Sequence, residues 1–172
     1  MNRRAVLLGL GGAAVGLAAR GETAAAATPI PLPTGSPVLT ISGKIRNPNK
    51  GADAVFDMTT LEGLGLTSFT TKTPWTPTTK FSGVLLDRLM KRIGAYGTTM
   101  VAYALNDYSA ELPISDFATY GPILATRMNG KYMPVTDKGP LFVVYPFDGN
   151  SDLARQTFYG RCVWQLDRMA IL

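Results

Sequence analysis

From residue 38 onward the sequence divides into short segments that alternate apolar and polar side chains or are rich in β-branched residues, separated by Gly, Pro, Asn and Asp. Such segments predict β-strands, because strand side chains alternate between two faces and turn residues end the strand. The strands do not alternate with long helices, as they would in a parallel α/β protein. The sequence therefore predicts a sheet-dominated α+β fold in a single domain. The expected strands cover residues 38–45, 54–58, 67–72, 100–105, 108–112, 123–128, 141–145 and 163–171.

Short helices are expected between these strands. Apolar residues recur at helical spacing over 84–93, which predicts a helix with Ser82 as its N-cap and Gly94 just past its end. Either Asp57 or Thr59 could cap a shorter helix earlier in the chain.

The first 27 residues have the features of an export signal. Two arginines precede an apolar stretch over residues 5–19, and three alanines end at Ala27, which fits a small-residue cleavage site. The apolar stretch is short for a membrane span. The paired arginines are typical of twin-arginine signals, although ordinary secretory signals also carry them. We expect a periplasmic protein, cleaved near Ala27, that does not insert stably into a membrane.

Removal of 27 of the 172 residues leaves 145, the length of one ordinary domain. Residues 28–37 are rich in proline and are expected to form an extended tether to a domain at 38–172. The formal net charge falls from +5 to +3, because the first 27 residues contain three arginines and one glutamate. A small charge spread along the chain does not predict a nucleic-acid partner.

The chain contains no histidine and one cysteine, Cys162. This composition excludes a Ser-His-Asp relay, a Cys-His pair, an imidazole metal site and an internal disulfide. No phosphate-binding loop pattern occurs either. Cys162 is expected in the closing strand, sharing its core-facing side with Trp164 and Leu166.

Two turns carry the side chains most suited to a ligand. Trp75 follows a strand within a hydroxyl-rich segment over 70–76, where it could stack on a flat ligand or pack on the core. Asn106-Asp107-Tyr108 forms a hairpin turn, although Asn and Asp are also favoured there for structural reasons.

Several segments follow one another in an order typical of a known family. They are Phe81-Ser82-Gly83-Val84-Leu85-Leu86, Asn106-Asp107-Tyr108, Met128-Asn129-Gly130 with Met133-Pro134, Gly139-Pro140-Leu141 through Pro146, and Arg161 through Leu166. Together they resemble the sulfite-oxidase fold, the molybdopterin-binding domain of oxidoreductases. The resemblance covers about residues 38–172 and implies one sulfite-oxidase-like molybdopterin-binding domain.

One loop of this chain differs from the pattern of that family. Catalytic members of that family hold molybdenum through a cysteine thiolate in the loop after the strand at 68–72. Here the loop reads Thr-Lys-Thr-Pro-Trp, and the Thr73 hydroxyl is not a soft sulfur ligand. No metal is therefore expected. Similarity to small exported members implies a pterin receptor that contacts the periplasmic domain of a membrane signalling protein, either a cyclic-di-GMP enzyme or a sensor kinase.

A pterin ligand, implied by the resemblance, sets the candidate binding residues. Its flat ring could stack on Trp75 or Tyr108, and its 2-amino and N3–H edge matches the Asp107 carboxylate. Its carbonyl edge needs a donor such as Arg127 or Arg161. The full expected binding set is Thr73, Trp75, Asn106, Asp107, Tyr108, Arg127 and Arg161.

Two other functions stay open, and binding is favoured over catalysis, with no catalytic residue assigned. The first is a molybdopterin-dependent oxidoreductase that holds its metal without protein sulfur or through Cys162. The second is a structural adaptor with an empty pocket.

Overall fold

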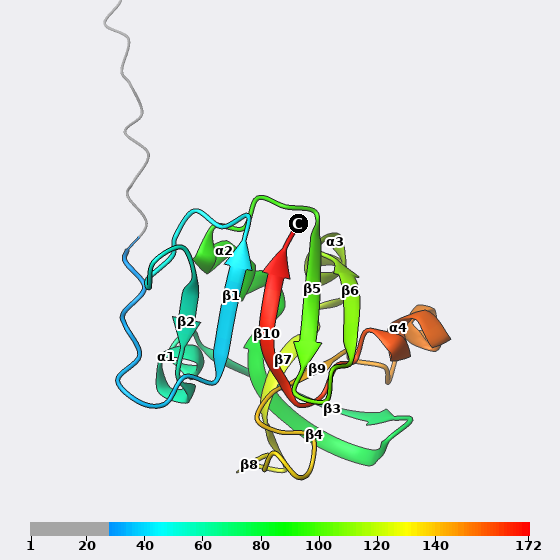
Figure 1. The fold of residues 1–172 in the computed structure, drawn as a ribbon. Helices are drawn as coiled ribbons and strands as arrows, with labels where there is room; N and C mark the ends of the chain where they lie inside the picture. The colour runs from blue at the N-terminus through cyan, green and yellow to red at the C-terminus, as the bar shows by residue number, and fades with distance from the viewer. Residues whose placement is uncertain (1–27) are drawn as a thin grey trace, which may run out of the picture.

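The computed structural model describes residues 28–172, so the predicted export signal over residues 1–27 lies outside the described residues. Two five-stranded sheets form the body of the protein (Figure 1). The first sheet has the order β2 (Ala54–Phe56), β1 (Leu39–Gly43), β10 (Leu166–Ile171), β5 (Thr99–Ala104) and β6 (Ser109–Pro113). Its strands β1 and β10 are parallel, and the other neighbours are antiparallel.

The second sheet is antiparallel and lies behind and below the first in Figure 1. Its order is β3 (Leu66–Thr73), β4 (Thr76–Leu85), β7 (Ile123–Met128) and β8 (Lys131–Tyr132), and β9 (Phe142–Val144) also pairs with β7. The helices are α1 (Met58–Glu62), α2 (Leu86–Ile93), α3 (Ser115–Tyr120), the 3-10 turn η1 (Ser151–Leu153) and α4 (Gln156–Gly160). The predicted sheet-dominated α+β fold is confirmed.

Both sheets and α2 contribute to one hydrophobic core. The Phe81 ring of β4 meets the Phe142 ring of β9 edge-on, with centroids 5.8 Å apart. Fully buried side chains from the first sheet, the second sheet and α2 belong to the same core: Leu39, Ile41, Met100, Val84, Leu124, Leu86, Leu89 and Ile93. A continuous core of this kind explains why the short strands form one domain.

The predicted helix over 84–93 is correct from Leu86 onward, and only its start is wrong. Residues up to Leu85 belong to β4, which pairs with β3 on one side and β7 on the other, so Ser82 is not a helix cap. Gly83 fits this strand because a side chain there would collide with the backbone of Leu124. Gly94 ends α2 in the left-handed conformation (φ 63°), as expected.

The closing strand is also shorter than expected. β10 begins at Leu166, and Gln165 adopts a left-handed conformation (φ 54°) that interrupts an extended chain. The Gln165 N–H is donated to the Lys138 carbonyl instead of to a neighbouring strand. The expectation that Cys162 and Trp164 share one strand face is therefore wrong, since both precede the strand.

The proline-rich segment over 28–37 lies against the domain. Ile30 is only 6% exposed and joins the core. Arg92 of α2 donates to the carbonyl oxygens of Thr28 and Pro29, the latter at 2.8 Å. No helix within residues 28–172 is long and apolar enough to cross a membrane.

Asp57 joins this segment to α1, and of the two expected caps it is the one observed. Its carboxylate accepts hydrogen bonds from the Thr60 hydroxyl and N–H, at 2.6 and 2.7 Å, and from the Gly35 and Thr34 N–H groups, at 2.7 and 2.8 Å. The bonds from Thr60, followed by those from Gly35 and Thr34, hold the pKa of Asp57 well below its ordinary value.

A lowered carboxyl pKa predicts acid sensitivity. The stabilisation from Asp57 is complete above the unfolded-state pKa, about 3.9, and is lost as the pH falls below that value. We expect the free energy of unfolding, measured by urea denaturation, to fall more steeply below about pH 4 in the wild type than in the Asp57→Asn variant. The exposed turn residue Asp107 provides the control, and Asp107→Asn should leave the acid slope unchanged. Equal acid slopes in the wild type and Asp57→Asn would contradict the prediction.

Candidate functional site

A pocket of about 270 Å³ lies where the β3–β4 turn, the β5–β6 turn and α4 meet. All of its lining residues are uncharged: Trp75, Asn106, Tyr108, Gln156, Tyr159, Gly160, Cys162 and Trp164. We call this site the aromatic pocket. It unites two of the turns that the sequence singled out with a third segment over 156–164, of which residues 163 and 164 were expected in the closing strand.

Trp75 forms the centre of the aromatic pocket. Its ring meets Trp164 with centroids 4.9 Å apart at 65°, and Tyr159 with centroids 6.5 Å apart at 84°. Such edge-to-face contacts are favourable, so the neighbours hold the ring in place. Trp75 nevertheless stays 38% exposed, which leaves part of its ring accessible to a ligand. The two interpretations of Trp75, as packing residue and as stacking surface, are therefore compatible.

The opposite wall is fixed by hydrogen bonds around Tyr108. The Tyr108 hydroxyl donates to the Gly160 carbonyl at 2.8 Å and so joins the β5–β6 turn to α4. The Asn106 side-chain oxygen accepts the Tyr108 N–H at 3.2 Å, as in an Asx turn. This bond uses the oxygen of Asn106 and leaves its NH₂ group for a ligand.

Cys162 borders the aromatic pocket but is only 2% exposed. Its thiol contacts the Phe158 carbonyl at 3.5 Å. Burial raises the pKa of the Cys162 thiol to about 12, so it stays protonated at neutral pH. The thiolate is the form that binds metals and attacks electrophiles. The structure thus brings Cys162 and Trp75 to the same pocket, which their separation in the sequence did not suggest, but Cys162 is an inert thiol there.

This burial predicts slow thiol chemistry. We expect a chromogenic disulfide reagent to react with Cys162 in the native protein at least about a hundredfold more slowly than in the urea-unfolded protein, because the thiolate is both scarce and covered. Release of the chromophore measures both rates, and Cys162→Ser gives the background. Similar rates in the native and unfolded protein would show that the thiol is open to solvent.

Thr73 does not line the aromatic pocket. Its hydroxyl is buried against the Thr76 hydroxyl at 2.8 Å and accepts the Trp75 N–H at 3.2 Å, so it shapes the β3–β4 turn. It borders a neighbouring hollow of about 360 Å³, which shares Tyr159 with the aromatic pocket.

Asp107 and Arg127 also lie outside the aromatic pocket. Asp107 occupies the tip of the β5–β6 turn in a left-handed conformation (φ 63°) and is exposed. The Arg127 guanidinium donates two hydrogen bonds to the Glu62 carboxylate, at 3.0 and 2.7 Å, and one to the Tyr132 hydroxyl. This pairing joins β7 to α1 and occupies Arg127 at another part of the fold.

Arg161 lies behind the wall of the aromatic pocket. Its guanidinium donates to the Asp116 carboxylate at 2.6 Å, and the Tyr145 hydroxyl donates to the same oxygen at 3.1 Å. Burial, and then the Asp116 charge, raise the pKa of Tyr145, which keeps its hydroxyl as a donor. Arg161 therefore secures the chain next to Gly160, and its ion pair with Asp116 is a support for the pocket.

Sequence reasoning missed Gln156, Tyr159 and Trp164 as pocket residues. Alternation over residues 161–166 predicted that Trp164 faces the core from the closing strand. The sequence does contain a signal against a strand at this point. Tyr159 is followed by Gly160, and no β-branched residue occurs between Tyr159 and Val163.

The described residues contain no group of three or more His, Cys, Asp or Glu side chains that could hold a metal ion. The pKa of Glu62, which accepts hydrogen bonds from three side chains, is set by opposing effects. Burial would raise it, but hydrogen bonds from Arg127, Thr126 and Tyr132 lower it overall.

Residues 56–148 match the model of the oxidoreductase molybdopterin binding domain. No curated protein sequence matches the chain significantly. A similar solved structure is that of the sulfane dehydrogenase SoxCD from Paracoccus pantotrophus, with a TM-score of 0.59 and 18% sequence identity. The similarity covers 77% of this chain but only 37% of the SoxCD chain, and at this identity it shows the fold alone. The chain belongs to the oxidoreductase molybdopterin-binding domain family and has a sulfite-oxidase-like fold.

Proposed function

We propose that this protein is a non-catalytic pterin receptor that acts on a membrane signalling partner in the periplasm. The observation that carries the proposal is the aromatic pocket, in which Trp75, Trp164, Tyr159 and Tyr108 surround an uncharged space. Its volume of about 270 Å³ is close to the lower end, about 300 Å³, of typical small-molecule pockets. A bicyclic ring suits this space better than a ring extended by a nucleotide.

The family cofactor, molybdopterin, combines a pterin with a metal-binding group, and the residues present fit only its first part. The aromatic pocket suits the pterin ring. The β3–β4 turn offers the Thr73 and Thr76 hydroxyls, which bond to each other, and Cys162 is a protonated thiol. These groups do not match the soft, deprotonated ligands of a protein-bound molybdenum centre. They support binding of a pterin without metal chemistry.

Polar recognition in this proposal comes from amides instead of charges. Asn106 and Gln156 line the aromatic pocket, and each side chain offers both donors and an acceptor. A pterin edge that presents a 2-amino group, an N3–H and a carbonyl can pair with such groups while the ring stacks on Trp75. In this proposal the side-chain amides, and not Asp107, Arg127 and Arg161, form the hydrogen bonds to the polar edge of the pterin.

The periplasmic location and the partner are supported by the sequence. The signal-like residues 1–27 carry the paired arginines and alanine-rich end of an exported protein. Small exported proteins that this chain resembles act as ligand receptors for membrane-bound cyclic-di-GMP enzymes or sensor kinases. A ligand in the aromatic pocket would contact two turns and α4 at once. Ligand binding would therefore change the conformation of a surface that a partner protein can contact.

Pterin release tests this function. The protein is isolated from its native periplasm and denatured, and the supernatant is examined for pterin fluorescence. Calorimetry then measures binding of a reduced pterin to the ligand-free protein. We expect fluorescence in the first experiment or saturable heat in the second. Absence of both would refute a pterin receptor.

A molybdopterin-dependent oxidoreductase is the second candidate, because Cys162 borders the aromatic pocket. Elemental analysis of the same native preparation separates the two functions. Stoichiometric molybdenum that is lost in Cys162→Ser would favour the oxidoreductase. Bound pterin without molybdenum would favour the receptor.

A further inference from the structure

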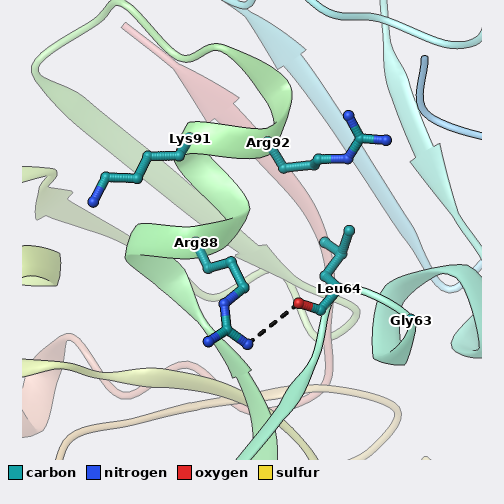
Figure 2. Close-up of a pocket in the computed structure, with 5 residues that line it drawn as sticks. All are labelled: Gly63, Leu64, Arg88, Lys91 and Arg92. Atoms are coloured by element: carbon teal, nitrogen blue, oxygen red, sulfur yellow. Dashed lines mark hydrogen bonds between the residues drawn. The ribbon is translucent and has the colours of Figure 1, made fainter. Parts of the chain in front are cut away.

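Another hollow lies between α2 and the chain that leaves α1 (Figure 2). Helices α2 and α4 lie on opposite sides of the domain in Figure 1. The hollow measures about 490 Å³ and is lined by Gly63, Leu64, Arg88, Lys91 and Arg92. We call it the basic groove. It shares no lining residue with the aromatic pocket, so both sites can be occupied together.

Two arginines in the basic groove are held by neutral partners. Arg88 donates from Nη1 to the carbonyl oxygens of Leu64 and Gly65, at 3.2 and 2.9 Å (Figure 2). Arg92 donates to the main-chain carbonyls of residues 28 and 29. A carbonyl oxygen fixes a guanidinium in place but carries no net charge, so the positive charges of Arg88 and Arg92 are not neutralised.

Lys91 adds a third cation. Its ammonium group contacts the Asp87 carboxylate at 2.6 Å, but the lysine side chain is 75% exposed. Exposed ion pairs contribute little free energy, so Lys91 can exchange Asp87 for another carboxylate. In Figure 2, Arg88, Lys91 and Arg92 extend from α2 in different directions, with Arg88 reaching Leu64 and Lys91 pointing away from Arg92. No carboxylate is among the residues that line it.

We propose that the basic groove binds an acidic, extended segment of a protein partner. Guanidinium groups pair with carboxylates through two parallel hydrogen bonds, and the carbonyl contacts already order Arg88 and Arg92 before binding. A chain segment with Asp or Glu side chains supplies such carboxylates at the spacing of neighbouring side chains. This inference concerns a different site from the pterin proposal and does not depend on it.

Binding of rhodamine-labelled hexaglutamate to the full-length protein, followed by fluorescence anisotropy at low ionic strength, tests the inference. Neutralising the groove in Arg88→Gln/Arg92→Gln should raise Kd about tenfold or more, because two charge-assisted contacts are lost. The variant Arg88→Lys/Arg92→Lys loses the same forked bonds to carbonyls but keeps the charges. It should lose clearly less affinity than Arg88→Gln/Arg92→Gln, because it keeps the charges although it loses the forked bonds, and this comparison separates loss of charge from loss of fold.

A matched control removes two cations elsewhere, in Lys80→Gln/Lys131→Gln on the second sheet, and should change Kd less than about twofold. An equal loss of affinity in this control would overturn the proposal, because the peptide would then sense only overall charge. Vesicles of phosphatidylglycerol provide the other comparison. Binding of vesicles, but not of hexaglutamate, with the same dependence on Arg88 and Arg92 would show a membrane-binding face and would also overturn it.

Discussion

Replacing Trp75 with alanine is expected to raise the Kd for a reduced pterin about 10- to 100-fold, because stacking of one base on an aromatic side chain contributes about 1–3 kcal/mol. Trp75 is the pocket residue best placed for this contact. Its edges are held by Trp164 and Tyr159, and 38% of its surface remains accessible. Calorimetric titration of the ligand-free protein gives the affinity of both forms.

Two variants make this measurement specific. Trp75→Phe keeps a smaller ring and should lose less affinity than Trp75→Ala. Tyr96→Ala removes an aromatic side chain that is 52% exposed, outside the aromatic pocket, and should bind the pterin like the wild type. If Trp75→Ala binds within about twofold of the wild type, stacking on Trp75 is not the basis of recognition.

Most strands could be predicted because their signals are local. The Asn129-Gly130 turn between β7 and β8 adopts the positive φ values, 49° and 81°, that this dipeptide predicts. The boundary between β4 and α2 could not be predicted in this way. Val84 and Leu85 fit the apolar spacing of the following helix, but both belong to β4. Val84 pairs with β3 and β7, and Leu85 pairs with β7. That pairing depends on residues far away in the sequence.

The aromatic pocket could be predicted in part for the same reason. Trp75, Asn106 and Tyr108 lie in turns, and the structure brings them together. The contribution of α4 depends on the irregular path of the chain between β9 and β10, which no local pattern specifies. The ion pair of Arg127 could not be predicted either, because its partner Glu62 lies 65 residues away in the sequence.

Removing the Asp116 carboxylate in Asp116→Ala is expected to lower the free energy of unfolding by about 3 kcal/mol, because breaking a largely buried ion pair leaves an unpaired charge. The side chains of Asp116 and Arg161 are only 10% and 20% exposed, and the buried Tyr145 hydroxyl loses its acceptor as well. Urea denaturation at neutral pH measures the loss. The Arg161 guanidinium lies 5.2 Å from the Phe158 ring centroid in α4, so the same change should loosen the wall of the aromatic pocket.

The exposed pair of Asp152 and Arg155 supplies the comparison for this effect. Its atoms are 3.6 Å apart and its side chains are 68% and 69% exposed, so Asp152→Ala should cost less than about 1 kcal/mol. Tyr145→Phe deletes only one hydrogen bond to Asp116 and should cost about 1 kcal/mol. If Asp116→Ala is no more destabilising than Asp152→Ala, Arg161 does not depend on Asp116. If Asp116→Ala also weakens pterin binding while the protein remains folded, the ion pair determines the geometry of the pocket as well as the stability of the domain.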